Sequence, residues 1–297
     1  MSGAAPTIPT IIDAPALLER YDGLLLDAYG VLVDAAGALP GARELVVAAR
    51  ARGLRTIVVT NDASRSPSTA AARLTGLGLD FSAEDVVTSG SLIAGHMARA
   101  GLTGCRCAVL GTADSRGYVA DAGATVVDLS DDTDIDALAV CDDAGYPFLA
   151  GAEAALSALY RRLDRGRPVA LILPNPDLIY PKSGGRFGFT AGAIALLLEA
   201  GLERRYGAAA PRFARLGKPA PLLFEEACRR LGAERQRVVM IGDQIETDIA
   251  GAHAAGIDAA LLENGVSRWR GDGSEVATPR WLLARLWPDP VRSSSLR

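Results

Sequence analysis

Asp27 is the side chain whose setting in this sequence most directly indicates chemistry. The apolar run 24–26 has the character of a strand, and it delivers Asp27 into a turn that contains Gly30. A carboxylate at the end of a buried strand is costly to desolvate unless a cation or hydrogen-bond donors meet it. An aspartate can also act as a nucleophile through a covalent aspartyl intermediate. The segment therefore predicts a reactive carboxylate whose partners come from elsewhere in the chain.

Three further polar segments are suited to be those partners. Thr60 and Asn61 end one apolar run, Asp243 ends another, and Lys218 precedes an expected helix. In an open parallel sheet, ligands bind beyond the carboxyl ends of the strands. A carboxylate nucleophile, a hydroxyl, an amide, an ammonium and a second carboxylate match phosphoryl transfer, whose transition state is stabilised by positioning and positive charge.

The carboxylates also predict a magnesium site. Mg²⁺ typically takes one or two protein carboxylates and fills its remaining positions with water and phosphate oxygen. Asp27 and Asp243 are the predicted ligands, and Asp248 stands at an expected helix start, where it caps the helix and orients Lys218 or a metal-bound water. Each residue alone could be a turn former, a helix cap or a solvated lysine. Their conjunction in this order favours the chemical interpretation.

Apolar runs alternate with amphipathic stretches along the chain, which is the pattern of βα units in a parallel sheet. The expected strands are 24–26, 55–59, 107–110, 125–127, 137–141, 169–173, 238–241 and 259–262. The expected helices are 41–52, 67–77, 114–122, 148–163, 190–201, 221–231 and 248–255. A glycine-rich stretch at 184–188 is expected to cross between two modules.

Composition excludes several classes of partner. The 297 residues carry a net charge of −4 with a pI near 5.4, which argues against a nucleic-acid or anionic-membrane partner. No apolar run approaches the length of a membrane span, and the first ten residues lack the charge and apolar block of a signal peptide. The four cysteines and two histidines lack the spacing of a zinc site. Free thiols in a reducing cytoplasm are the expectation.

Four motifs of the chain resemble those of the haloacid dehalogenase superfamily. They are Asp27-Ala28-Tyr29-Gly30-Val31-Leu32, Val59-Thr60-Asn61, Gly217-Lys218-Pro219 and Gly242-Asp243-X4-Asp248. Further segments narrow the resemblance to the class IIA hydrolases, the branch that includes nucleotide and 4-nitrophenyl phosphate phosphatases. These are Leu39-Pro40-Gly41-Ala42, Thr88-Ser89-Gly90, Asn175-Pro176-Asp177 and 251–257.

The resemblance implies an α/β fold, with a Rossmann-like core of parallel sheet and a large α/β cap inserted into it. The core is expected to comprise residues 1–89 and 189–297, and the cap residues 90–188. Such caps close over the core site and select substrates. Asn175 and Asp177 are therefore expected on the substrate side of the cap, with a structural turn as the alternative. Caps of this class often dimerise, which implies a homodimer.

The resemblance also assigns roles to the polar segments. Asp27 would be the nucleophile and a metal ligand, with Asp243 and the backbone carbonyl of Tyr29 as the other protein ligands of Mg²⁺. Three residues would hold the transferring phosphoryl group of a small phosphorylated substrate: Thr60, Asn61 and Lys218.

One position departs from the pattern of the family phosphatases. They usually carry, two residues after the nucleophile, an aspartate that protonates the leaving oxygen and later activates water. Here that position is Tyr29, and a phenol is a poor base at neutral pH. Metal-independent 2-haloacid dehalogenases of the superfamily resemble the chain at this point, so dehalogenation is one alternative, and a weak or non-catalytic phospho-ligand binding protein is another. The pair Asp243 and Asp248 favours a Mg²⁺-dependent phosphohydrolase.

Overall fold

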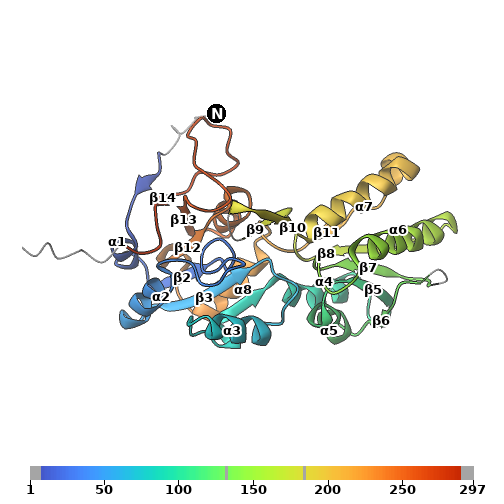
Figure 1. Ribbon diagram of the computed structural model, residues 1–297, viewed down its shortest axis with the longest axis horizontal. Helices are drawn as coiled ribbons and strands as arrows, with labels where there is room; N and C mark the ends of the chain where they lie inside the picture. Colours follow the sequence, from blue (N-terminus) through green and yellow to red (C-terminus); the bar gives the residue numbers. More distant parts are fainter. Residues whose placement is uncertain (1–7, 131–132, 183–184, 289–297) are drawn as a thin grey trace, which may run out of the picture.

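The computed structural model describes residues 8–130, 133–182 and 185–288. Within these residues the chain forms two parallel sheets, each covered by helices, and one antiparallel hairpin (Figure 1). The two α/β units lie side by side along the long axis of the molecule. The predicted α/β class, with a parallel-sheet core and a large α/β cap, is confirmed, and the sheet of the second unit is parallel as well.

The larger sheet has seven strands in the order β1-β14-β13-β12-β2-β3-β4, all of them parallel. Its strands are β1 (Thr10–Ile11), β2 (Gly23–Leu26), β3 (Arg55–Thr60), β4 (Val86–Thr88), β12 (Val238–Gly242), β13 (Asp258–Leu262) and β14 (Trp281–Leu283). The surrounding helices are α1 (Ala14–Leu18), α2 (Ala42–Ala51), α3 (Pro67–Gly76), α8 (Leu222–Leu231) and α9 (Ala250–Ala254). Short helical turns are η1 (Ala83–Asp85), η2 (Ser89–Leu92), η5 (Arg235–Arg237) and the π-helical η6 (Ile245–Ile249).

Both faces of this sheet are buried, because neighbouring strand residues point to opposite sides. Leu24 and Leu26 of β2 pack into a cluster with α2 and α3, whereas Leu25 packs into a second cluster with α8. A strand buried on both faces reads as a continuous apolar run, which is why β2, β3 and β12 were recognisable in the sequence. The helices fix the sheet and leave its carboxyl edge open to polar side chains.

The smaller sheet has five strands in the order β11-β8-β7-β5-β6. Its strands are β5 (Arg106–Leu110), β6 (Thr125–Val127), β7 (Ala137–Val140), β8 (Ala170–Leu173) and β11 (Ala214–Arg215). Its helices are α4 (Ile93–Arg99), α5 (Ala113–Asp121), α6 (Phe148–Asp164) and α7 (Ala191–Tyr206), followed by the turn η4 (Gly207–Ala209). α6 and α7 cover one face, and α4 and α5 contribute to the cluster on the other.

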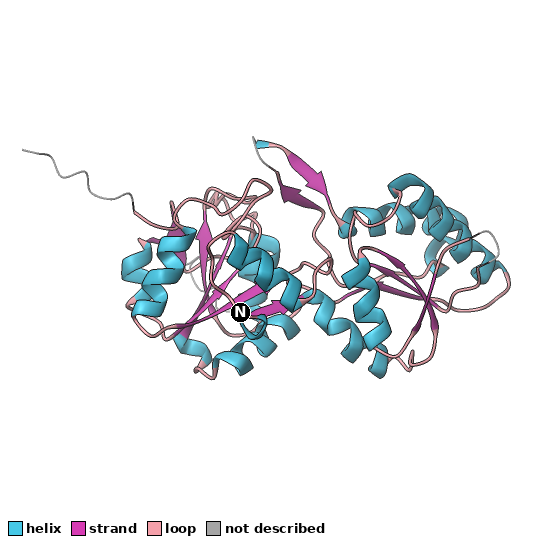
Figure 2. Ribbon diagram, turned by 60° about the horizontal axis from the view of Figure 1, so that its bottom comes forward, coloured by secondary structure: helices cyan, strands magenta, loops and turns pink. Residues whose placement is uncertain are grey.

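The boundary predicted at residue 188 differs from this arrangement. Helix α7 packs with α6 on the smaller sheet, and β11 pairs with β8 at the edge of that sheet. The predicted crossing at 184–188 lies partly outside the described residues, and its described end, 187–188, belongs to β10 (Phe187–Phe189). This strand pairs antiparallel with β9 (Ile179–Pro181), and the two strands project between the two units (Figure 2). We propose that the inserted unit, called the cap below, runs from residue 90 to residue 215.

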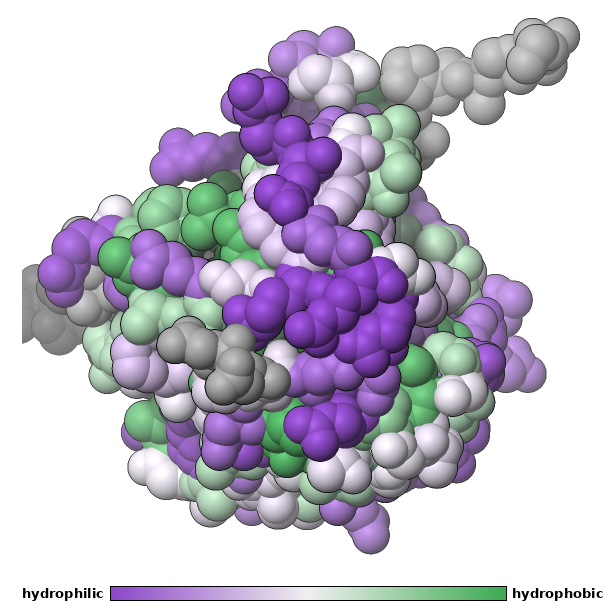
Figure 3. All heavy atoms as spheres, turned by 90° about the vertical axis from the view of Figure 1, so that its right-hand side faces the viewer, coloured by the Kyte–Doolittle hydropathy of each residue, from purple (hydrophilic) through white to green (hydrophobic). Residues whose placement is uncertain are grey.

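The far end of the cap is mostly polar. Figure 3 shows this end with hydrophilic side chains at its centre and apolar ones scattered between them. In the described ranges, no helix combines the length and the apolar character needed to cross a membrane.

Candidate active site

The carboxyl ends of β2, β3 and β12 place the predicted polar residues at one edge of the larger sheet. Leu26 of β2 lies opposite Val58 of β3 and opposite Ile241 of β12, so the residues that follow these strands are neighbours. Six predicted site residues meet there and all are buried: Asp27, Thr60, Asn61, Lys218, Asp243 and Asp248. Residues far apart in the chain therefore form one polar centre.

Lys218 is the buried cation of this centre. Its Nζ lies 2.8 Å from Asp27 Oδ1 and 2.7 Å from Asp248 Oδ1, and it donates a hydrogen bond to the carbonyl of Val59. Its backbone N–H donates to Asn61 Oδ1 at 2.7 Å, which fixes the amide. Burial disfavours the ammonium, but the carboxylates of Asp248 and Asp27 outweigh burial and raise the pKa of Lys218.

Asp248 holds the turn after β12. Its Oδ2 accepts hydrogen bonds from the backbone N–H groups of Asp243 and Gln244, both at 3.1 Å. Its Oδ1 accepts the hydrogen bond from Lys218 Nζ. The helical region begins at Ile245, earlier than the predicted start at 248, because the π-helical turn η6 precedes α9. Asp248 thus connects the turn that carries Asp243 to the buried lysine.

Three carboxylates in this centre have the arrangement of a cation site. Oxygens of Asp27, Asp243 and Asp248 lie within 4.8 Å of one another. Burial and the charge of Asp248 raise the pKa of Asp243 to about 7, and the same two causes raise the pKa of Asp27. Asp243 Oδ1 is buried without a hydrogen-bond partner in the described part of the chain. An orphaned oxygen among crowded carboxylates fits a hard divalent cation.

Gly30 makes room for Asp243, and it carries a testable prediction. Its φ is +91°, and a Cβ there would lie 2.1 Å from Asp243 Oδ2. We expect Gly30→Ala to lower the free energy of unfolding by at least about 2 kcal/mol, because left-handed φ and the clash add. Chemical denaturation measures the change. Gly76→Ala is the control, since a Cβ there meets nothing within 4 Å. Equal changes in both variants would contradict the role assigned to Gly30.

The predicted cap residues reach the same centre. Asn61 Nδ2 donates to Asp177 Oδ1 at 2.9 Å, across the two units. Asn175 supports the turn instead: its Oδ1 accepts from the N–H of Asp177 at 3.0 Å, and its Nδ2 donates to Thr190 Oγ1 at 3.0 Å. Asp177 therefore faces the core residues, whereas Asn175 shapes the loop that presents it.

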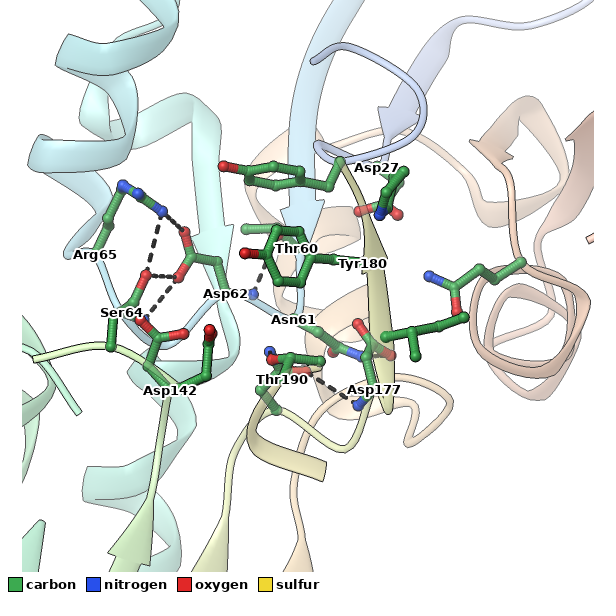
Figure 4. A pocket seen from close by; sticks show the side chains of 17 residues that line it. Asp27, Thr60, Asn61, Asp62, Ser64, Arg65, Asp142, Asp177, Tyr180 and Thr190 are labelled. Carbon is green, nitrogen blue, oxygen red and sulfur yellow. Dashed lines mark hydrogen bonds and ion pairs between the residues drawn. The ribbon is translucent and has the colours of Figure 1, made fainter. Parts of the chain in front are cut away.

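A cavity lies between the core and the cap above these residues (Figure 4). Asp27, Thr60, Asn61 and Asp177 line it together with residues that the sequence analysis did not name. The unnamed lining residues include Asp62, Ser64, Arg65, Asp142, Tyr180, Thr190 and Gln244. A usable signal existed for one of them, because Asp142 comes two residues after the end of strand β7.

Tyr29 forms part of the cavity wall. Its ring meets that of Tyr180 edge-on, with centroids 5.9 Å apart. The guanidinium of Arg73 lies 5.1 Å from the centre of the Tyr29 ring, at cation–π distance. The phenol ring thus bridges the core and the β9–β10 hairpin.

Comparison with known proteins identifies the family. Residues 24–125 match the family described as haloacid dehalogenase-like hydrolase, and residues 215–287 match the one described as HAD-hydrolase-like. The chain belongs to the haloacid dehalogenase superfamily, in its class IIA branch of phosphoric monoester hydrolases. The resemblance predicted from the motifs is confirmed.

Individual relatives include two curated phosphatases. A dihydroxyacetone phosphatase from Corynebacterium glutamicum is 27% identical over 273 residues, which cover 90% of this chain and 92% of that protein. A D-glycerol 3-phosphate phosphatase from Mycobacterium tuberculosis is 32% identical over 260 residues, which cover 86% of this chain and 66% of that protein.

Solved structures share the whole arrangement. A possible sugar phosphatase of the HAD superfamily from Cytophaga hutchinsonii has a TM-score of 0.81 and 28% identity, over 95% of this chain and 100% of that one. A glycerol phosphate phosphatase from Mycobacterium tuberculosis in complex with magnesium has a TM-score of 0.70 and 27% identity, over 89% of this chain and 76% of that one.

Proposed function

We propose that this protein is a Mg²⁺-dependent phosphohydrolase of small sugar or glycerol phosphates that works through an aspartyl-phosphate intermediate on Asp27. The observation that carries the proposal is the buried centre in which Lys218 bridges Asp27 and Asp248 beside the orphaned oxygen of Asp243. The named activities of the relatives, on dihydroxyacetone phosphate and glycerol phosphate, support the substrate class.

The proposed chemistry has two steps. A carboxylate oxygen of Asp27 attacks phosphorus as the ester P–O bond breaks, which gives the aspartyl phosphate and releases the ester oxygen, which leaves as the alcohol when it takes up a proton. Thr60, Asn61 and Lys218 hold the phosphoryl oxygens. Water then attacks the aspartyl phosphate, releases inorganic phosphate and restores the carboxylate of Asp27.

The residues for a bound Mg²⁺ are Asp27, Asp243 and the backbone carbonyl of Tyr29. The ion would neutralise charge on the phosphoryl oxygens and on the crowded carboxylates. A relative solved in complex with magnesium supports the choice of ion. The homodimer and the cytoplasmic location stay predictions.

A second candidate function, metal-independent dehalogenation, has one observation in its favour. Tyr29 stands where haloacid dehalogenases carry tyrosine, and a metal-free displacement at carbon needs no acid at that position. The carboxylate pair Asp243 and Asp248 opposes it, because such a displacement has no use for a cation site. The large α/β cap opposes it as well.

One assay separates these functions. We expect phosphate release from glycerol 3-phosphate, dihydroxyacetone phosphate and hexose phosphates with Mg²⁺, a fall of at least about 100-fold with chelator, and recovery with excess Mg²⁺. We expect no halide from 2-haloacids. Phosphate release that survives chelation would sink the proposal, and metal-independent halide release would favour the dehalogenase. Stabilisation by phosphate esters without any product would indicate a binding protein.

A further inference from the structure

The tyrosine at position 29 leaves the reaction without its usual proton donor. An alkyl phosphate expels an alkoxide, which is a poor leaving group unless it is protonated as the P–O bond breaks. We propose that Asp177, on the cap, protonates the leaving oxygen and then takes a proton from the attacking water. This inference rests on the proposed phosphohydrolase function and adds a catalytic residue to it.

The geometry of Asp177 suits this role. Its Oδ1 accepts from Asn61 Nδ2 at 2.9 Å, whereas Oδ2 has no hydrogen-bond partner among residues 8–130, 133–182 and 185–288. The carboxyl lines the same cavity as the Asp27 nucleophile. Figure 4 shows Asp27, Asn61 and Asp177 on one side of this cavity. The free oxygen is thus available to a group that leaves from phosphorus toward the cap.

The loop that carries Asp177 is held on both sides. Its backbone N–H donates to Asn175 Oδ1 at 3.0 Å, and its carbonyl accepts from the N–H of Gly192 at 3.0 Å. Gly192 packs directly on this carbonyl, where a Cβ would lie 2.4 Å from the oxygen. Helix α7 therefore fixes the carboxyl, as positioning of a catalytic group requires.

The surroundings of Asp177 raise its pKa toward neutral pH. Burial raises the pKa of Asp177 to about 6, with Lys218 and the hydrogen bond from Asn61 acting in the opposite direction. The charge of Asp248 raises it as well, and Asp243 is also close enough to interact with Asp177. A group with this pKa exchanges protons readily near pH 6 to 7, as an acid in one step and a base in the next requires.

Two other carboxyls of the cavity, those of Asp62 and Asp142, are less suited. Asp62 is committed to Ser64, whose N–H and Oγ lie 2.7 and 2.6 Å from its Oδ1, and to Arg65 at 2.9 Å from its Oδ2. Asp142 lies with Ser64 on the side of the cavity away from Asp27 (Figure 4). Asp177 is the carboxyl of this group that contacts the phosphoryl-binding residue Asn61.

The proton balance closes over the two steps. In the first step, the protonated carboxyl of Asp177 gives its proton to the ester oxygen as Asp27 forms its bond to phosphorus. In the second step, the carboxylate of Asp177 takes a proton from water as the water oxygen attacks phosphorus. Asp177 ends protonated, Asp27 ends as a carboxylate, and no further reactant is needed.

Asp177→Asn tests the proposal through the leaving group. We expect kcat/KM to fall about 100-fold or more for glycerol 3-phosphate and less than about threefold for 4-nitrophenyl phosphate, whose leaving group needs no proton. In the wild type, kcat/KM for glycerol 3-phosphate divided by kcat/KM for 4-nitrophenyl phosphate should fall as pH rises through about 6. In the variant this ratio should be independent of pH. If the role of Asp177 were purely structural, the variant would lower kcat/KM for both esters by the same factor.

Two further variants complete the test. Asp142→Asn, the same change on the other side of the cavity, should change kcat/KM for both esters by the same factor. Tyr29→Asp, introduced into Asp177→Asn, should restore glycerol 3-phosphate hydrolysis at least about tenfold, because it returns a carboxyl to the usual position. If Asp177→Asn lowers kcat/KM by the same factor for both esters, the role of Asp177 is overturned and the proposed function is not. A wild type that hydrolyses neither ester would overturn the proposed function and this role with it.

Discussion

Asp27→Asn is expected to lower phosphate release by at least about 10⁴-fold, because it removes the atom that bonds to phosphorus. The amide keeps the shape of the carboxylate, so the turn to Gly30 and the packing of β2 are retained. Activity is measured at saturating Mg²⁺ with 4-nitrophenyl phosphate and glycerol 3-phosphate. The variant should lose activity on both esters by a similar factor, because every ester needs the nucleophile. In Asp177→Asn the two losses should differ.

A second measurement ties this loss to the covalent step. Acid quenching of the wild type during turnover should trap protein heavier by one phosphoryl group, and Asp27→Asn should show no such species. Asp34→Asn, at the next aspartate along the chain, is the matched control and should keep its activity, because the carboxylate of Asp34 accepts hydrogen bonds from the backbone N–H groups of Ala36 and Gly37 in its own turn. Retention of more than a few per cent of activity in Asp27→Asn would remove Asp27 from the mechanism.

The sequence was informative where chemistry coincides with a local pattern. Asp27 and Asp243 directly follow apolar runs that are buried on both faces, and parallel strands bring their carboxyl ends together. Lys218 is different, because nothing in its own neighbourhood distinguishes it from a solvated lysine. Only the order of the motifs predicted its contact with Asp27, and the distance between them, 2.8 Å, is a property of the tertiary fold.

The proposed limits of the cap depend on tertiary contacts for a related reason. Strand β11 is two residues long and has no alternation to detect, and it is defined by its pairing with β8. The glycine-rich stretch 184–188 gave no sign of a strand, because glycine is common in linkers, whereas its described residues 187–188 belong to β10. Asp142 shares the pattern of a polar residue after a strand in the cap, because it comes two residues after the apolar strand β7.

Lys218→Met is expected to cost about 3–5 kcal/mol of unfolding free energy at pH 8 without metal, because it leaves buried carboxylates uncompensated. Methionine preserves most of the volume of the lysine side chain. Urea denaturation with chelator measures the loss. Lys182→Met is the matched control: it changes the only other lysine of the sequence, which lies over the ring of Tyr180, and it should cost less than about 1 kcal/mol.

The pH dependence distinguishes charge from packing. The pKa values of Asp27 and Asp243 are raised in the folded protein, so these carboxyls bind protons more readily when folded than when unfolded. Their contribution to stability therefore falls as pH rises, and loss of Lys218 makes the fall steeper. The raised pKa of Lys218 keeps the wild-type lysine charged throughout this range. The cost of Lys218→Met should shrink at pH 5, and Mg²⁺ should reduce it at pH 8. An equal cost at both pH values would show that lost packing, and not uncompensated carboxylate charge, destabilises the variant.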